Sequence, residues 1–211
     1  SAYLFLIGIS GTSGKSSTIY FLRQILERAG LRVGALSTIE FYIAGREKLN
    51  DQKMTMLGRT FIQKKLREMV TAHCDVAIIE STSEGYLQSR HRFINFDVMA
   101  LTNLYPEHIE AHGGFANYKA AKLGLFRYAA RCKPKLIKGK IVNKVAVVNA
   151  SCPYQAEFLA FSFGEKKLFK PENVTVTPAG LNFQVEGHDF FLTLPGEHTA
   201  ENVSAAIAIA R

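Results

Sequence analysis

Short apolar runs alternate with longer segments whose apolar residues recur every three or four positions over the first 150 residues. The apolar runs predict buried strands at Tyr3–Ile9, Leu31–Thr38, Asp75–Glu80, Phe96–Thr102 and Lys144–Asn149. The periodic segments predict helices over Lys15–Ala29, Leu57–Ala72 and Tyr118–Arg131. Strands that alternate with helices form parallel βαβ units. The pattern therefore predicts an α/β fold with a doubly wound, mainly parallel sheet and helices on both faces.

The pattern changes after about residue 160. Short strands are expected at Val174–Val176, Leu181–Val185 and Phe190–Leu194, separated by turn residues, and this spacing is typical of a small antiparallel meander. A closing helix is expected from about Ala200 to Arg211. A further short strand or hairpin is expected at Phe41–Lys48, around Gly45. The closing helix reaches the last residue without a capping signal, so we expect the chain to be a piece of a longer protein.

Length and composition fit one soluble domain. The 211 residues are 47% hydrophobic, and no apolar run reaches the roughly 18–20 residues of a membrane helix. We therefore expect no membrane partner and no signal peptide. The cysteines Cys74, Cys132 and Cys152 are few and widely spaced, which favours a reducing cytoplasm over a disulfide framework or a zinc site.

The net charge of +8 suits anionic partners. The densest basic stretch, Arg131 to Lys144, has no interleaved aromatic residues and no motif that reads nucleic acid. We therefore expect anionic small molecules rather than nucleic acid.

The segment Gly8–Thr18 joins the first strand to the first helix and predicts a loop that cradles the phosphates of ATP. Glycines let backbone amides converge on phosphate oxygens, and the helix N-terminus adds partial positive charge. Lys15 is expected at the β- and γ-phosphates, and the Ser16 hydroxyl at Mg²⁺. Ile9 stands where the general motif has glycine, which marks a subclass. The expected phosphate-binding residues are Gly11, Thr12, Ser13, Gly14, Lys15, Ser16 and Ser17.

Glu80 ends the predicted third strand, Asp75–Glu80. A carboxylate at the carboxyl end of a parallel strand, on the side of the phosphate loop, is suited to bind the metal of a nucleotide. A solvated residue at a strand end is the alternative for Glu80, as an ordinary glycine-serine turn is for the loop.

Five segments, in order along the chain, resemble the Mur ligase family. Gly11–Ser17 resembles the Gly-Thr-x-Gly-Lys loop of Mur ligases and folylpolyglutamate synthases. Ala77–Arg90, with its Gln88-Ser89-Arg90, resembles a block specific to the UDP-N-acetylmuramyl-tripeptide synthetases. Thr102–Glu110, Tyr118–Phe126 and Gly196–Asn202 resemble later motifs of the same branch. The chain is thus similar to the ATP-binding central domain of these enzymes over its whole length.

The resemblance implies roles for individual residues. Ser16 and Glu80 would bind the Mg²⁺ that bridges the ATP phosphates, and His108 a second Mg²⁺. Lys122 would be carboxylated by CO₂ to a carbamate whose oxygens ligate Mg²⁺. Lys15, His108 and Lys122 would be the catalytic residues. Asn202 would contact adenine, and the UDP-sugar-peptide substrate would contact Thr55, Thr82, Gln88 and Arg90.

The resemblance also implies the reaction and the domain organisation. ATP would activate a UDP-MurNAc-peptide carboxylate as an acyl phosphate, which an amino acid amine then attacks. Residues 1–211 would form the central domain, while absent N-terminal and C-terminal domains grip the UDP end and the amino acid. We expect a monomer that binds Mg-ATP weakly and does not ligate by itself. A folylpolyglutamate-synthase-like or poly-amino-acid ligase, or a non-catalytic nucleotide-binding module, are the alternatives.

Several positions depart from the family pattern on the substrate side. Glu84 replaces a histidine, Met56 a threonine, and Thr199 an asparagine. Glu107 replaces the aspartate before His108, which keeps the charge on a longer side chain. These departures leave the added amino acid and the exact UDP-sugar substrate open.

Overall fold

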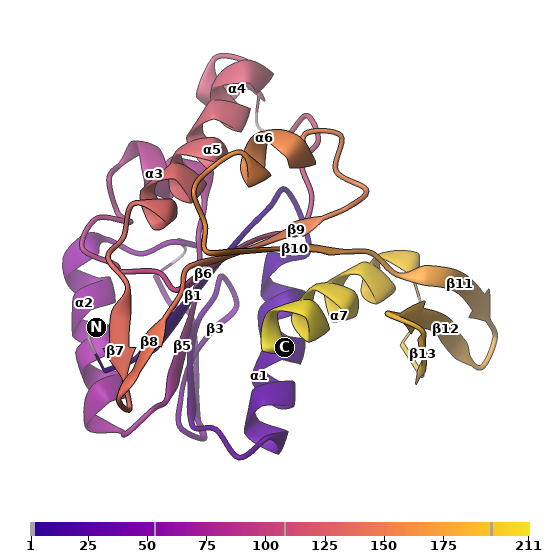
Figure 1. Cartoon of the computed structure of the whole chain (residues 1–211), viewed down its shortest axis with the longest axis horizontal. Helices are drawn as coiled ribbons and strands as arrows, with labels where there is room; N and C mark the ends of the chain where they lie inside the picture. The colour runs from indigo at the N-terminus through magenta and orange to yellow at the C-terminus, as the bar shows by residue number, and fades with distance from the viewer. Residues whose placement is uncertain (1–2, 53, 108, 195) are drawn as a thin grey trace.

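The computed structural model describes residues 3–52, 54–107, 109–194 and 196–211. An eight-stranded sheet forms its centre, with the strand order β10-β9-β6-β1-β5-β2-β3-β4 (Figure 1). The first six of these strands run parallel to one another, and β3 and β4 add an antiparallel hairpin at one edge. The strands are β1 Phe5–Ser10, β2 Val33–Leu36, β3 Glu40–Ile43, β4 Arg46–Leu49, β5 Val76–Glu80, β6 Val98–Leu101, β9 Val145–Asn149 and β10 Glu165–Phe169.

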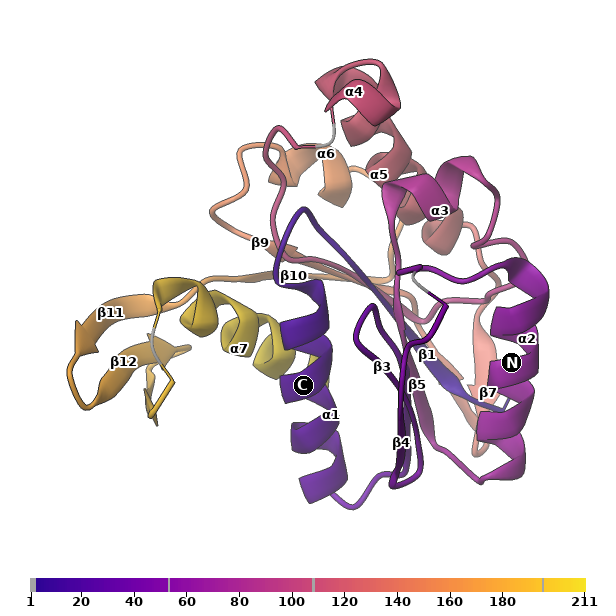
Figure 2. The same cartoon turned by 180° about the vertical axis from the view of Figure 1, so that it is seen from behind.

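Helices cover both faces of the sheet. On one face, α1 (Lys15–Arg28) and α7 (Glu197–Ala210) pack their apolar residues on the strands. On the other face lie α2 (Arg59–Thr71) and α5 (Phe115–Ala130), as the two opposite views show (Figures 1 and 2). The short helices α3 (Ser83–Leu87), α4 (Ile109–His112) and α6 (Gln155–Leu159) follow β5, β6 and β9. The predicted doubly wound fold is confirmed.

A three-stranded antiparallel sheet lies to one side of this body, against α7 (Figures 1 and 2). Its strands are β11 (Glu172–Thr177), β12 (Gly180–Val185) and β13 (His188–Leu192). Leu181, Phe183 and Val185 point toward Ala200 and Val203 of α7 and form a separate small core. The predicted meander is confirmed.

The sequence did not predict the short helices α3, α4 and α6, and it also missed two features of strand structure. β10, with the sequence EKKLF, extends the main sheet beyond β9. As an edge strand it is largely exposed, so it lacks the continuous apolar run of a central strand. The second is a hairpin of β7 (Lys135–Ile137) and β8 (Lys140–Val142) within the basic stretch.

No helix among the described residues is long and apolar enough to cross a membrane.

The β7–β8 hairpin turns its charge inward. Lys135 is buried, whereas Leu136 and its cross-strand partner Ile141 are 68% and 73% exposed. This orientation is the reverse of the usual alternation, in which apolar residues face the core. The reversal explains why the hydrophobic pattern gave no sign of the hairpin.

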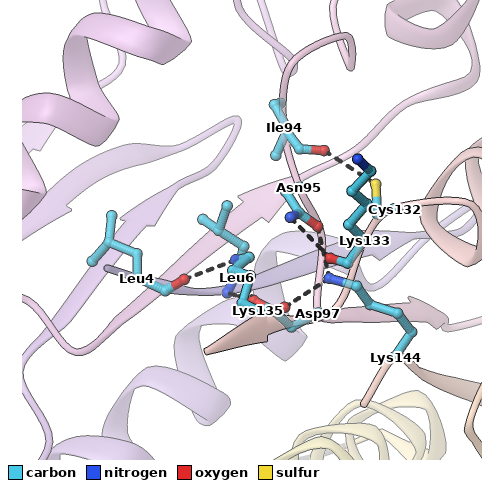
Figure 3. Close-up of polar contacts among 9 residues, drawn as sticks. All are labelled: Leu4, Leu6, Ile94, Asn95, Asp97, Cys132, Lys133, Lys135 and Lys144. Atoms are coloured by element: carbon cyan, nitrogen blue, oxygen red, sulfur yellow. Dashed lines mark hydrogen bonds and ion pairs between the residues drawn. The ribbon is translucent and has the colours of Figure 1, made fainter. Parts of the chain in front are cut away.

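Asp97 is the reason that Lys135 points inward (Figure 3). This fully buried carboxylate lies at the start of β6, where Oδ2 accepts hydrogen bonds from the Leu6 amide (2.8 Å) and from Lys135 Nζ. Its Oδ1 accepts one from Lys144 Nζ (2.9 Å). Lys135 also donates to the Leu4 carbonyl (2.9 Å). Burial lowers the pKa of Lys135, an effect that the charge of Asp97 opposes. Lys135 and Lys144, two lysines of the basic stretch, are therefore paired in the interior and do not contribute to a basic surface patch.

Replacing Asp97 with asparagine tests this cluster. Asp97→Asn keeps the shape but leaves two buried ammonium groups without a counter-charge, and we expect a loss of about 3–5 kcal/mol in the free energy of unfolding. Urea unfolding measures this. Asp51→Asn, which removes the partner of Lys48 in an exposed ion pair, is the control and should leave the midpoint unchanged. Equal midpoints for the two variants would contradict the assigned role of Asp97.

Candidate functional site

The loop between β1 and α1 requires glycine at two positions. Gly11 and Gly14 have φ values of 153° and 76°, where side chains are strongly disfavoured. A Cβ at Gly11 would lie 1.8 Å from Thr102 Oγ1, and one at Gly14 would lie 2.1 Å from Asn202 Oδ1. The predicted loop is thus enclosed by β6 on one side and by α7 on the other.

Asn103, which follows β6, fixes the middle of this loop. Its Oδ1 accepts hydrogen bonds from the backbone amides of Thr12 (3.1 Å) and Ser13 (2.9 Å). Thr102 Oγ1 donates to the Ser13 carbonyl (2.7 Å). The Tyr118 hydroxyl of α5 donates to Thr12 Oγ1 (3.2 Å). The first turn of α1 begins at Lys15, and the first amides of a helix have no acceptor within it. These amides face the position that the sequence predicts for phosphate.

Two lysines converge on the carbonyl oxygen of Gly11. Lys15 Nζ donates to it at 3.1 Å and to the Thr12 carbonyl at 3.0 Å. Lys122 Nζ donates to the Gly11 oxygen at 2.7 Å and lies 4.5 Å from the centre of the Tyr118 ring. Both predicted lysines therefore reach the same loop.

Burial perturbs the titration of both lysines. It lowers the pKa of Lys15, against the attraction of Glu80 and Glu107. Lys122 is only 2% exposed, and burial together with the positive charge of Lys15 holds its pKa well below 10.5. Two cations in this position favour either an anionic ligand or an uncharged Lys122.

Glu80 ends β5, between β1 and β2, and is 2% exposed. Its Oε2 accepts hydrogen bonds from Ser16 Oγ (2.9 Å) and from the Thr38 amide (2.8 Å), and its Oε1 accepts one from Thr38 Oγ1 (3.0 Å). The structure thus brings the predicted residues Ser16 and Glu80 into contact. Thr38 was not predicted: it follows β2, and only the pairing of β2 with β5 in the sheet brings it to Glu80.

The oxygen atoms of Ser16 and Glu80 are donors that Mg²⁺ prefers. Over the described ranges there is no group of three or more histidine, cysteine, aspartate or glutamate residues arranged to hold a metal. Mg²⁺ commonly binds through one or two carboxylates together with phosphates and water. The residues present fit a metal ion of that kind, held jointly with a phosphate ligand.

The predicted second metal site is described only in part. His108 lies outside the described residues. Lys122 is on α5, and its Nζ points toward the loop at Gly11. The negative charge of Glu107 acts on both lysines and partly opposes the lowering of their pKa values by burial.

The four predicted substrate residues gather around α3. The Thr82 hydroxyl caps this helix by accepting from the Gly85 amide (3.0 Å). Gln88 follows the helix, and its side-chain oxygen accepts from Arg90, which also donates to the Met56 carbonyl. Thr55, next to Met56 in the chain, lies 3.0 Å from Thr38 through their hydroxyl oxygens. The 55–56 segment and the 82–90 segment therefore form one surface beside Glu80.

Met56 and Glu84, two of the departures from the family pattern, have structural partners here. Met56 is buried, and a Cβ at Gly85 would lie 2.4 Å from its sulfur, so Met56 fills the space over α3. Glu84 accepts a hydrogen bond from Gln88 Nε2 (2.8 Å).

A cavity of about 730 Å³ adjoins the loop on the side of α7. Its walls include Ser13, Gly14, Ser17, Asn103, His198, Glu201 and Asn202. The predicted Asn202, on α7, thus lies beside the phosphate-binding loop. His198 and Glu201 were not predicted. The spacing 198, 201 and 202 places all three side chains on one helix face, and this periodicity was the available signal.

Residues 9–210 match the family model of the Mur ligase middle domain. The chain belongs to the Mur ligase middle-domain family. It is 29% identical over 213 residues to the UDP-N-acetylmuramoyl-L-alanyl-D-glutamate–2,6-diaminopimelate ligase of Chlamydia abortus, a match that covers 99% of this chain. It is 30% identical over 221 residues to the UDP-N-acetylmuramyl-tripeptide synthetase of Roseiflexus sp., covering 97% of this chain. The resemblance to the Mur ligase family is therefore confirmed.

Solved structures agree on the fold. A UDP-N-acetylmuramoyl-L-alanyl-D-glutamate–2,6-diaminopimelate ligase superposes with a TM-score of 0.79 at 20% identity, over 99% of this chain and 43% of that one. The folylpolyglutamate synthetase from Lactobacillus casei gives 0.57 at 17% identity, over 98% of this chain and 56% of that one. The chain spans 43% of the length of each of the two curated Mur ligases named above.

His91 links the substrate-side segment to the core and gives a test of the packing. It is 6% exposed, stacks on Tyr86 with ring centres 4.6 Å apart, and meets the edge of Tyr128 at 4.7 Å. Burial lowers its pKa from 6.5. The unfolded chain therefore takes up a proton at His91 more readily than the folded one, so stability falls as pH drops through about 6.5.

We expect His91→Phe to keep the ring packing and to remove this dependence. Between pH 7.5 and 5.5 the wild type should lose about 1 kcal/mol more in the free energy of unfolding than the variant, measured by urea unfolding at each pH. His73→Phe, at an exposed position, provides the control. The same loss in all three proteins would show that His91 is not the group responsible.

Proposed function

We propose that this chain is the ATP-binding central domain of an ATP-dependent ligase in peptidoglycan precursor synthesis. The convergence of Lys15, Ser16 and Glu80 at the N-terminus of α1 is the observation that carries this proposal. The relatives named above support a UDP-MurNAc-peptide as the carboxylate substrate and an amino acid as the amine. Through this pathway the protein would contribute to cell wall formation, cell shape and division.

The proposed reaction has two steps. A carboxylate oxygen of the UDP-MurNAc-peptide attacks the γ-phosphorus of ATP, and the bond from that phosphorus to ADP breaks. The amine of the amino acid then attacks the acyl carbon, loses a proton and displaces phosphate. Lys15 offsets the negative charge that gathers on the phosphates. Mg²⁺, held by Ser16 and Glu80, would supply Lewis acidity at the phosphate oxygens.

Lys122 is proposed to carry a carbamate. Only an uncharged amine attacks CO₂, and burial beside Lys15 favours the uncharged form of Lys122. Formation of the N–C bond releases one proton and turns the uncharged amine into an anion with two oxygen donors. His108 would share a second Mg²⁺ with this group. Asn202 is proposed to contact adenine within the cavity beside Gly14.

The surface formed by Thr55, Thr82, Gln88 and Arg90 is proposed to bind the sugar-peptide substrate, together with a UDP-binding domain. A further domain would bring the amino acid. We propose a cytoplasmic monomer without nucleic-acid or membrane partners. The alternatives are a folylpolyglutamate-synthase-like or poly-amino-acid ligase, or a non-catalytic nucleotide-binding module. The Gln88-Ser89-Arg90 segment favours the first proposal.

Titration calorimetry with Mg-ATP tests nucleotide binding by the 211-residue chain. Lys15→Met removes the charge at the phosphates, and we expect affinity to fall at least about tenfold. Lys119→Met removes a lysine of α5 that pairs with Glu157 of α6, and this variant should bind as the wild type does. Failure of the wild type to bind any adenine nucleotide would overturn the proposal.

Carbon-13 NMR with labelled bicarbonate tests the carbamate. We expect a carbamate carbonyl signal in the wild type that Lys122→Ala eliminates and Lys119→Ala retains. The signal should grow as pH rises, because a larger fraction of amine is then uncharged. Its absence from the wild type, or its presence in Lys122→Ala, would rule out Lys122 as the modified residue.

A further inference from the structure

Thr38 stands between the metal-binding carboxylate and the segment proposed to bind the substrate. It follows β2, and its Oγ1 lies 3.0 Å from Glu80 Oε1 and 3.0 Å from Thr55 Oγ1. Its backbone amide lies 2.8 Å from the other carboxylate oxygen of Glu80. One residue therefore holds both oxygens of Glu80.

The chemistry of the groups sets the direction of these hydrogen bonds. An ionised carboxylate only accepts, and a hydroxyl has one proton to donate. The Thr38 hydroxyl therefore donates to Glu80, and the Thr55 hydroxyl donates to Thr38. An ordered series of hydrogen bonds therefore runs from Thr55 through Thr38 to Glu80. Ser16 Oγ, on α1, donates a further hydrogen bond to Glu80.

The segment that carries Thr55 is tied to the end of β2 a second time. Asn50 Nδ2 donates to the carbonyl of Ser37 (2.9 Å) and to that of Met54 (2.9 Å). The segment that carries Thr55 is thus hydrogen-bonded to both Ser37 and Thr38. Hydrogen bonds in series polarise one another, so the bond from Thr55 strengthens the bond from Thr38 to the carboxylate.

We propose that Thr38 is a positioning residue that couples the Thr55 segment to the carboxylate of Glu80. The inference rests on the proposed function, because it assigns Glu80 to the metal of a bound nucleotide. It adds that Thr55 influences Mg-ATP binding without touching the nucleotide, and that this influence requires the Thr38 hydroxyl. Occupation of the substrate surface and of the nucleotide site are then energetically linked.

A double-mutant cycle on the 211-residue chain tests this coupling. Thr38→Val keeps the shape and the backbone bond but removes the hydroxyl, and we expect Mg-ATP affinity to fall about tenfold, as for loss of a hydrogen bond to a charged group. Thr38→Ser should restore it. Thr55→Val should weaken binding about threefold alone and have no further effect in the Thr38→Val background. Affinity for ATP in EDTA should be equal in all variants.

A control variant and the contrary outcomes distinguish failure of the coupling through Thr38 from failure of the proposed function. Thr71→Val, at an exposed threonine near the end of α2, should leave affinity unchanged. Independent, multiplied effects of Thr38→Val and Thr55→Val would overturn the coupling, as would wild-type affinity in Thr38→Val. An equal loss with and without Mg²⁺ would show a merely structural role for Thr38. No binding by the wild type would instead remove the proposed function itself.

Discussion

The side-chain nitrogens of Lys15 and of the buried Lys122 share the carbonyl oxygen of Gly11, and the rest of the site is arranged around these two lysines. Burial disfavours both cations, so the site gains stability from whatever negative charge reaches it. Glu80 and Glu107 supply part of this negative charge to Lys15, and Glu107 also acts on Lys122. The parallel sheet makes this convergence possible, because the carboxyl ends of β1, β2, β5 and β6 meet at one edge.

The sequence predicted those parts of the fold and the site in which one pattern dominates. Continuous apolar runs located the central strands, and the glycines with Lys15 and Ser16 located the loop. Glu80 was found because it closes such a run. The later motifs gave Lys122 and Asn202, which the structure places beside the loop, and the residues around α3. The roles of all these residues stay predictions.

What the sequence did not predict depends on contacts between distant residues. Thr38 and Asn103 are polar residues at strand ends with no distinctive spacing, and only the strand order brings them to Glu80 and to the loop. The hydrophobic pattern did not indicate the β7–β8 hairpin because Lys135 faces the interior, where it binds Asp97, 38 residues away in the chain. The solvent-facing side of β10 removed the apolar signal on which strand prediction relies.

Strand β6 has a consequence for how this chain can change in length. Asp97 precedes this strand, Val98–Leu101, and binds two lysines at its amino end. Thr102 and Asn103 follow the strand and form hydrogen bonds with the loop at its carboxyl end. Side chains alternate along a strand, so one inserted or deleted residue would turn one of these groups to the wrong face. The contacts at the two ends of β6 therefore fix the number of residues between them. Length differences among homologues are expected at the exposed hairpin turns instead.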